Sequence, residues 1–286
     1  MPAATRRTSP GDSRDAASAP ELVLTFASRD RVRVLARGSV QRRHGRVVMT
    51  KSVDEFRAAF AAEIVDAAVV DLAAPSAAAS GAALLAREFP SVAFIGVLPY
   101  RVADAPRLAE CAALDFADII ADGIDDGALR PLVAAHGFSV RFADALRDPP
   151  SSLGLSSTLQ LAAWRCICAH TGRALGTERL ATTLGVSREH LSRSFAASGS
   201  NLKRVADLVR VLAAAELAKN PGYDSGDVAR VLGFATLSQL TQLLTRTAGV
   251  TVASLSRLRA VDLIQRFMRS SRRSGERSGS DGGQRP

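Results

Sequence analysis

The sequence has few of the residues that build metal sites and disulfide frameworks. Its 286 residues include three cysteines and four histidines. An odd number of cysteines without metal-ligand spacing argues against a disulfide scaffold and against a zinc site. Cys166 and Cys168 lie within an apolar helical pattern, so we interpret them, with Cys111, as unligated residues, and the first two as buried in a helix.

Long apolar runs are also missing. No uncharged stretch approaches the roughly 18 to 20 residues that a membrane-spanning helix needs. The first segment carries Arg6, Arg7 and Arg14 among small and polar residues, without the apolar stretch of a signal peptide. We therefore expect a cytoplasmic protein with no membrane partner.

The chemistry of an enzyme is not evident. The histidines are scattered, and there is no Cys/His pair, phosphate-binding loop or set of metal-spaced ligands. The sequence therefore predicts no enzyme, no catalytic residue, no metal and no cofactor.

Positive charge is concentrated in the C-terminal half. The net charge is +9, but residues 21–140 carry 13 basic and 15 acidic residues, whereas residues 151–268 carry 14 and 7. The two regions thus have net charges of −2 and +7. This asymmetry is typical of a polyanion-binding region, although solvated basic faces in an arginine-rich chain would explain the charge alone equally well.

A division into two domains follows from composition. The stretch from Asp148 to Ser152 combines two helix-stopping prolines with small polar residues, so we predict a linker at 148–155. It separates an N-terminal domain, 21–147, from a C-terminal domain, 156–268. Residues 1–20 and a basic tail, 269–286, are predicted to be disordered because they lack the apolar residues needed for a core.

The C-terminal domain contains the pattern of a helix-turn-helix. Leu180, Ala181 and Leu184 form the apolar face of one helix, and Gly185 suits a left-handed turn. Ser187 is a candidate cap for the next helix, whose core side holds Leu191 and Phe195. The outward positions of that second helix are the candidate DNA-binding residues Arg188, Glu189, His190, Ser192 and Arg193.

The same pattern repeats about fifty residues later, after a long helix predicted from Lys203 to Ala218. The segment Ser225-Gly226-Asp227 is predicted to cap a helix, Gly233 to turn the chain, and Thr236 to cap a second helix containing Leu240 and Leu244. The candidate DNA-binding residues of this unit are Leu237, Ser238, Gln239, Thr241, Gln242 and Arg246.

Together these motifs resemble the DNA-binding domain of the AraC/XylS family over about 90 residues. The residues that carry the resemblance include Leu184-Gly185-Val186-Ser187, His190-Leu191-Ser192-Arg193, Arg210-Val211, Leu232-Gly233-Phe234 and Thr247-Ala248-Gly249. The resemblance implies a seven-helix module whose two recognition helices enter successive major grooves, roughly 34 Å apart, joined by the long helix.

The second unit departs from the family pattern. Leu240 and Leu244 stand where the family usually has aromatics, Thr245 replaces a lysine, and Val252 replaces a proline. Leucines can fill the same core, but amides and a hydroxyl replace charge on the recognition face, so we predict that the first unit supplies most of the affinity. Arg193 could form a surface salt bridge instead of contacting DNA. Arg210, in the middle of the long linking helix, could equally pair with Asp207 or Glu216 and stiffen the module.

The N-terminal domain alternates short apolar runs with helical patterns. Strands are predicted at 22–26, 47–49, 67–72, 92–98 and 118–120, and helices near 31–41, 53–62, 82–88, 106–113 and 127–135. This order predicts an α/β fold with a parallel, doubly wound sheet. The section from Val53 onward resembles a response-regulator receiver, with Asp71 at the end of a buried strand and Pro75 four residues later.

The phosphorylation chemistry of receivers is largely absent. The resemblance implies an acidic pair that holds Mg²⁺ after the first strand, but no carboxylate lies between Glu21 and Asp30. Leu98 stands in place of the receiver threonine, and Asp122 in place of its lysine. We therefore interpret the domain as a degenerate receiver in which Asp71 is a degenerate phospho-site.

These observations predict a bacterial, nucleoid-associated transcription regulator that binds duplex DNA sequence-specifically without phosphorylation. Homodimerisation through the N-terminal domain and contact with RNA polymerase are further partner hypotheses. The alternative is a protein-interaction adaptor with a degenerate receiver domain and weakened DNA reading.

Overall fold

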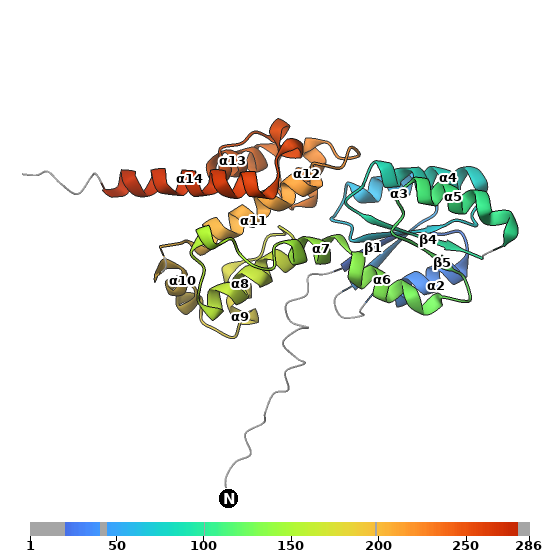
Figure 1. Ribbon diagram of the computed structural model, residues 1–286, viewed down its shortest axis with the longest axis horizontal. Coiled ribbons are helices and arrows are strands. Elements are labelled where there is room, and N and C mark those ends of the chain that lie inside the picture. Colours follow the sequence, from blue (N-terminus) through green and yellow to red (C-terminus); the bar gives the residue numbers. More distant parts are fainter. Residues whose placement is uncertain (1–20, 41–44, 100, 198, 280–286) are drawn as a thin grey trace, which may run out of the picture.

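A five-stranded parallel sheet forms the centre of the N-terminal half (Figure 1). The structure is a computed structural model that describes residues 21–40, 45–99, 101–197 and 199–279. The strands are β1 (Glu21–Phe26), β2 (Gly45–Thr50), β3 (Ala67–Asp71), β4 (Ala93–Leu98) and β5 (Asp118–Ala121), in the order β2-β1-β3-β4-β5. This is a doubly wound, flavodoxin-like order, and it confirms the predicted α/β fold.

Helices cover both faces of the sheet. They are α2 (Asp30–Gly38), α3 (Val53–Phe60), α4 (Ser76–Leu84), α5 (Ala105–Ala113) and α6 (Leu129–His136). Helices α2 and α6 lie on one face, and α3, α4 and α5 on the other (Figure 1). Helix α4 begins six residues before the predicted start at Ala82, because its alanine-rich sequence has no apolar periodicity that would mark a helix.

A further helix, α7 (Phe138–Ala145), follows the sheet and joins it to the C-terminal half. Its first turn is held by Asp66, whose carboxylate accepts a hydrogen bond from the backbone N–H of Ser139 at 2.9 Å. At its other end, the indole N–H of Trp164 donates to the carbonyl oxygen of Leu146 at 2.6 Å. Helix α7 is therefore tied to both halves of the chain.

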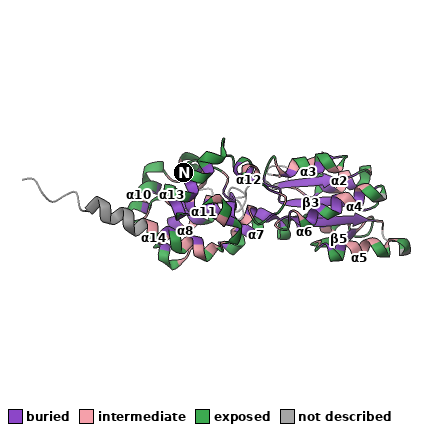
Figure 2. Ribbon diagram, turned by 90° about the horizontal axis from the view of Figure 1, so that it is seen from above, coloured by how far each residue is buried: buried purple, intermediate pink, exposed green. Residues whose placement is uncertain are grey.

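The predicted linker at 148–155 is packed rather than extended. It contains a short 3₁₀ turn, Ser151–Leu153, and the side chains of Leu153 and Leu155 are buried. The domain boundaries drawn from the sequence stay predictions, since the apolar core continues past this segment (Figure 2).

The C-terminal half is all-helical, as predicted. Its helices are α8 (Thr158–Ala169), α9 (Thr177–Thr183), α10 (Arg188–Ala197), α11 (Leu202–Leu217), α12 (Ser225–Val231), α13 (Leu237–Ala248) and α14 (Ala260–Gly279), with a 3₁₀ segment, Val252–Arg257. Asp224 caps α12 by accepting from the backbone N–H of Asp227 at 2.7 Å. The predicted cap at Ser225 was therefore one residue late.

Helix α14 continues to Gly279, so it extends into the tail from 269 onward that was predicted to be disordered. Leu263 and Phe267 bury the start of this helix against α11 and α13, and extending a helix that is already nucleated adds one hydrogen bond per residue fixed. Residues 1–20, also predicted to be disordered, and 280–286 lie outside the described residues. No helix in the described part of the chain is long and apolar enough to cross a membrane.

The two halves also meet directly at the segment between α11 and α12. The ring of Phe89 packs edge-on against Tyr223 with 5.0 Å between centroids, and the backbone N–H of Gly222 donates to the carbonyl of Glu88 at 2.9 Å. Asn220 accepts from the backbone N–H of Ser91 at 2.9 Å. The sheet domain thus contacts the segment between α11 and α12 here, and α8 through α7.

Candidate nucleic-acid interface

Helices α9 and α10 form the first helix-turn-helix. Gly185 turns the chain with a φ of +67°, a left-handed conformation that favours glycine. The Ser187 hydroxyl accepts from the backbone N–H of His190 at 3.1 Å, which confirms it as the cap of α10. Leu191 and Phe195 are fully buried, so the opposite face of α10 is directed away from the core.

All five candidate DNA-binding residues of α10 are exposed. They are Arg188, Glu189, His190, Ser192 and Arg193. The Arg193 guanidinium makes one long hydrogen bond, from Nε to the carbonyl of Glu189 at 3.4 Å. Most of its donors therefore stay available for an external acceptor, and the alternative of a surface salt bridge has no support among the described residues.

Helices α12 and α13 form the second helix-turn-helix. Gly233 has a φ of +74°, and the Thr236 hydroxyl accepts from the backbone N–H of Gln239 at 3.3 Å, as predicted for a turn and a cap. Leu240 and Leu244 are fully buried, so leucines fill this core. The six candidate residues of the second unit, Leu237, Ser238, Gln239, Thr241, Gln242 and Arg246, are all exposed.

Three of these six side chains are engaged by the protein itself. The Gln239 amide oxygen accepts from the backbone N–H of Ala235 at 3.1 Å, and the Thr241 hydroxyl donates to the carbonyl of Leu237 at 3.0 Å. The Arg246 guanidinium forms an ion pair with Asp207 of α11 at 2.8 Å. This last contact, which the sequence did not indicate, turns the one basic candidate of the second unit toward a carboxylate.

Arg210 has a structural role, but through other contacts than predicted. Its guanidinium lies 3.9 Å above the Phe234 ring and donates to the carbonyl oxygens of Gly172 and Leu232 at 3.3 and 3.2 Å. Burial lowers its pKa, and the nearby carboxylate of Asp207 opposes that shift. Arg210 thus ties the central helix to the loop between α8 and α9 and to the turn of the second unit.

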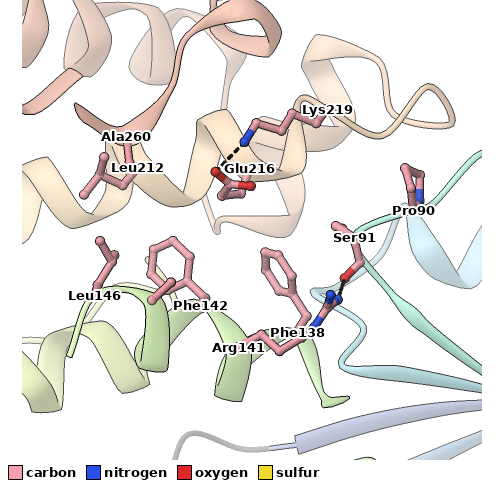
Figure 3. Close-up of a pocket in the computed structure, with 11 residues that line it drawn as sticks. Pro90, Ser91, Phe138, Arg141, Phe142, Leu146, Leu212, Glu216, Lys219 and Ala260 are labelled. Carbon is pink, nitrogen blue, oxygen red and sulfur yellow. Dashed lines mark hydrogen bonds and ion pairs between the residues drawn. The ribbon is translucent and has the colours of Figure 1, made fainter. Parts of the chain in front are cut away.

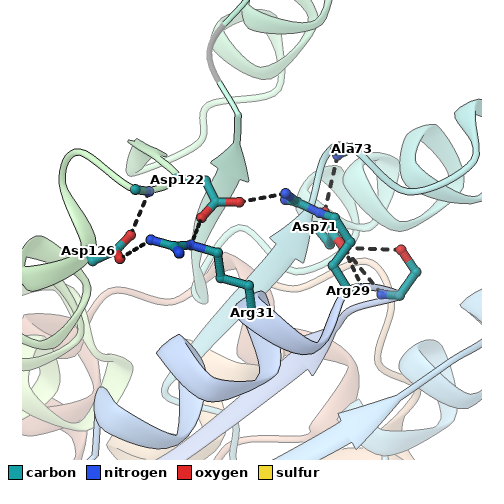
Figure 4. Close-up of polar contacts among 8 residues, drawn as sticks. Arg29, Arg31, Asp71, Ala73, Asp122 and Asp126 are labelled. Carbon is teal, nitrogen blue, oxygen red and sulfur yellow. Dashed lines mark hydrogen bonds and ion pairs between the residues drawn. The ribbon is translucent and has the colours of Figure 1, made fainter.

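The degenerate phospho-site is filled by side chains of the protein (Figure 4). Asp71, at the end of β3, is fully buried. Its carboxylate accepts from the backbone N–H of Ser28 at 3.3 Å and of Arg29 at 3.1 Å, and from the Ser28 hydroxyl at 3.1 Å. The guanidinium Nε of Arg29 donates to its other oxygen at 2.9 Å.

The ion-pair network extends to Asp122, which stands where a receiver has its lysine. Arg29 Nη1 lies 2.5 Å from Asp122, and Arg31 contacts both Asp122 and Asp126. Burial opposes the charge of Arg29, but its hydrogen bonds and charge interactions with Asp71 and Asp122 outweigh burial and raise its pKa. A permanent cation therefore occupies the centre of this site.

Arg29 and Arg31 were not predicted as residues of this site. The lack of a carboxylate after the first strand was evident from the sequence, but the contacts of the basic residues there were not predicted. Both signs are reversed relative to the receiver pattern: an arginine lies where an acidic pair would be, and Asp122 where a lysine would be. That reversal was visible in the sequence once the strand ends were aligned.

All three cysteines are buried, as was predicted for Cys166 and Cys168. Burial raises the pKa of Cys111 to about 11 and that of Cys168 to about 12, and it raises the pKa of Cys166 as well. The thiols are therefore protonated and unreactive near neutral pH.

Comparison with known proteins identifies the helical half. Residues 180–257 match the family model of a helix-turn-helix domain, which confirms the AraC-type helix-turn-helix predicted from the sequence. This domain marks the chain as a DNA-binding transcription regulator. No curated protein matches the chain.

Among solved structures, full-length FixJ from B. japonicum is similar over 80% of this chain and 97% of that chain, with 12% sequence identity and a TM-score of 0.35. The receiver-like fold of the N-terminal half is assigned from its own strand order and helix placement.

Proposed function

We propose that this protein is a sequence-specific transcription regulator that binds duplex DNA mainly through α10 and acts without phosphorylation. The observation that carries the first part is the exposed face of α10, where Arg188 and Arg193 project beside polar neighbours. Arginine can contact phosphate oxygens or the edge of a guanine in the major groove. The net charge of +7 over residues 151–268 supports the same partner.

The second part rests on the network around Asp71. A phosphorylated receiver needs room for Mg²⁺ and a phosphoryl group beside the acceptor carboxylate. Here the Arg29 guanidinium holds that carboxylate, and Asp122 would repel an incoming phosphoryl group. The two buried carboxylates of the site, Asp71 and Asp122, are both paired with arginines without a ligand, which supports a domain that keeps one state.

The experiment that tests this function is capture of genomic DNA fragments by the full-length protein, followed by sequencing. We expect a shared sequence among the retained fragments, and an affinity for it that falls steeply as salt rises because bound phosphates release their counterions. Arg193→Ala should reduce the slope of log affinity against log salt by about one. Arg87→Ala, an exposed arginine of the sheet domain, is the matched control and should leave the slope unchanged.

A second candidate function is that of a protein-interaction adaptor with weakened DNA reading. It is favoured by the engagement of Gln239, Thr241 and Arg246 within the protein. Folded protein that enriches no DNA sequence would support this candidate over the first. Homodimerisation through the N-terminal domain and contact with RNA polymerase stay predictions, which sedimentation and binding assays with purified polymerase would test.

A further inference from the structure

A cleft of about 410 Å³ lies between α7 and α11, at the junction of the two halves (Figure 3). Protein interiors rarely leave voids larger than a water molecule, and pockets of this size fall within the range of small-molecule sites, about 300 to 1,000 Å³. Arg141, Ala145 and Lys219 on its rim are exposed, so the cleft opens to solvent.

One end of the cleft is apolar. Leu146, directly after α7, faces Leu212 of α11 and Ala260 of α14, and the rings of Phe138 and Phe142 form the floor between this end and the sheet domain (Figure 3). Such a lining would receive an aliphatic or aromatic body, because removing apolar surface from water is favourable.

The other end carries charge of mainly one sign. Arg141 lies there with its guanidinium donating to the carbonyl oxygen of Ser91, and Lys219 pairs with Glu216 at 2.6 Å (Figure 3). An arginine has five N–H donors and a lysine three, so each cation keeps donors that these contacts do not use. The one carboxylate, by contrast, already accepts from a lysine. The unused hydrogen-bond donors at this end therefore suit an anion.

We propose that the cleft binds a small molecule with an apolar body and a single carboxylate group. The body would lie between Phe142 and Leu212, and the carboxylate would reach Arg141 and Lys219, whose charge-assisted hydrogen bonds fix its orientation. Nothing in this assignment depends on DNA binding.

The position of the cleft between the two halves gives it a regulatory consequence. This consequence, unlike the ligand site itself, rests on the proposed function. Helix α7 is held by the sheet domain through Asp66, and Leu146, directly after α7, accepts a hydrogen bond from Trp164 of α8, the helix that precedes the first helix-turn-helix. Helix α11 connects the two helix-turn-helix units. A ligand that touches both helices, and binds one of their relative placements better than another, shifts DNA affinity in proportion to that difference.

The binding test uses the full-length protein and anilinonaphthalene sulfonate, a dye that has an apolar body and one negative charge and fluoresces in apolar surroundings. We expect saturable fluorescence, displaced by decanoate at a concentration about tenfold lower than by decylamine, with decanol between them. Lys219→Met should narrow the difference between the concentrations of decanoate and decanol that displace the dye. No saturable dye binding, or stronger displacement by the amine, would overturn the proposal.

Three matched variants locate the site. Ala145→Phe and Ala260→Phe add a ring to the cleft wall and should lower dye fluorescence at least about fivefold, whereas Ala135→Phe on the exposed face of α6 should leave it unchanged. Ala145 is on the surface, so its variant should fold even if the Ala260 variant does not. Equal dye binding by Ala145→Phe and the control would place the dye elsewhere and contradict the assignment.

A separate measurement tests the regulatory consequence. DNA affinity, followed by fluorescence anisotropy, should change at least about fivefold when decanoate saturates the cleft, and should not change in Ala145→Phe. If the protein binds dye but no DNA, the proposed function fails while the ligand site stands. If it binds DNA but no dye, the ligand site fails, and an unchanged DNA affinity with bound decanoate rejects the coupling alone.

Discussion

The Arg29 guanidinium lies 2.8 Å from the buried carboxylate of Asp71, in the place where a receiver binds its metal ion. Asp71 is fully buried and Arg29 is about 29% exposed, so removing one partner leaves a charge in a poorly solvated position. The pair therefore provides the first and most direct test of the N-terminal domain.

We predict that Arg29→Ala lowers the free energy of unfolding by about 3 kcal/mol, because it leaves the Asp71 carboxylate without its cation. Urea denaturation of the full chain measures this change through the shift in midpoint. The double variant Arg29→Ala, Asp71→Asn should be less destabilised than the sum of the two single variants, since the second change removes the uncompensated charge. Strict additivity would show that the two groups are not coupled.

Acetyl phosphate with Mg²⁺ should neither modify Asp71 nor change DNA affinity. The acceptor oxygens are already bonded to Arg29, Ser28 and Ala73, and Asp122 adds repulsion. Intact-mass measurement of the treated protein, with Asp71→Asn as the control, checks this. A phosphoryl adduct present in the wild type and lost in Asp71→Asn would show that the site still accepts phosphate.

The two recognition helices should contribute unequally to DNA affinity. Arg193→Ala is expected to weaken binding to a captured site about tenfold, or about 1.4 kcal/mol, because it removes a charge-assisted contact. Gln242→Ala should cost less and mainly relax sequence preference in the half-site of α13, since a neutral amide reads a base edge without charge. Both residues are exposed, so circular dichroism melts should be nearly unchanged. The reverse order of losses would assign the main anchor to α13.

Neutralising Asp207 should strengthen DNA binding. Its carboxylate holds Arg246, which lies on the exposed face of the second recognition helix. Asp207→Asn is expected to raise affinity about threefold to tenfold, because it frees the guanidinium and removes a negative charge near the phosphates.

Two control variants separate these effects. Asp118→Asn makes the same change of net charge in the sheet domain and should have no effect on DNA affinity. Adding Arg246→Ala to Asp207→Asn should cancel most of the gain. A gain that survives in the double variant would mean that general electrostatics, rather than the released arginine, is responsible.

Local patterns predicted most of the fold. Each strand was placed to within about two residues because buried parallel strands are short apolar runs between turn residues, and Ser187 and Thr236 marked helix starts through caps that act over three residues. Helix α7 was missed because no neighbouring side chain caps it, and the carboxylate that accepts from its first turn, Asp66, lies 73 residues before Ser139.

The contacts at the second recognition helix and around Asp71 could not be predicted for the same reason, because their partners are distant in the sequence. Arg246 and Asp207 are 39 residues apart, and Arg29 is 42 residues from Asp71 and 93 from Asp122. A single sequence does not encode such pairs in any local period, so the exposed recognition residues could be predicted, whereas the Arg246–Asp207 pair could not. For Arg29 and Asp122, the residues at the strand ends showed the reversed charges but not the contacts between them.

The attachment of α7 to Asp66 has a consequence for the nascent chain. Domains emerge and fold in order of synthesis, N-terminal part first, so the sheet and its docked α7 can be complete before α8 leaves the ribosome. The carbonyl of Leu146 and the rings of α7 would then already be in place when Trp164 is synthesised. The buried indole N–H of Trp164 requires a hydrogen-bond acceptor, and the Leu146 carbonyl is that acceptor. We therefore expect the regulator to be built on its sheet domain as a template, and a helical half expressed from Ser151 onward to mature more slowly than the same residues in the whole chain.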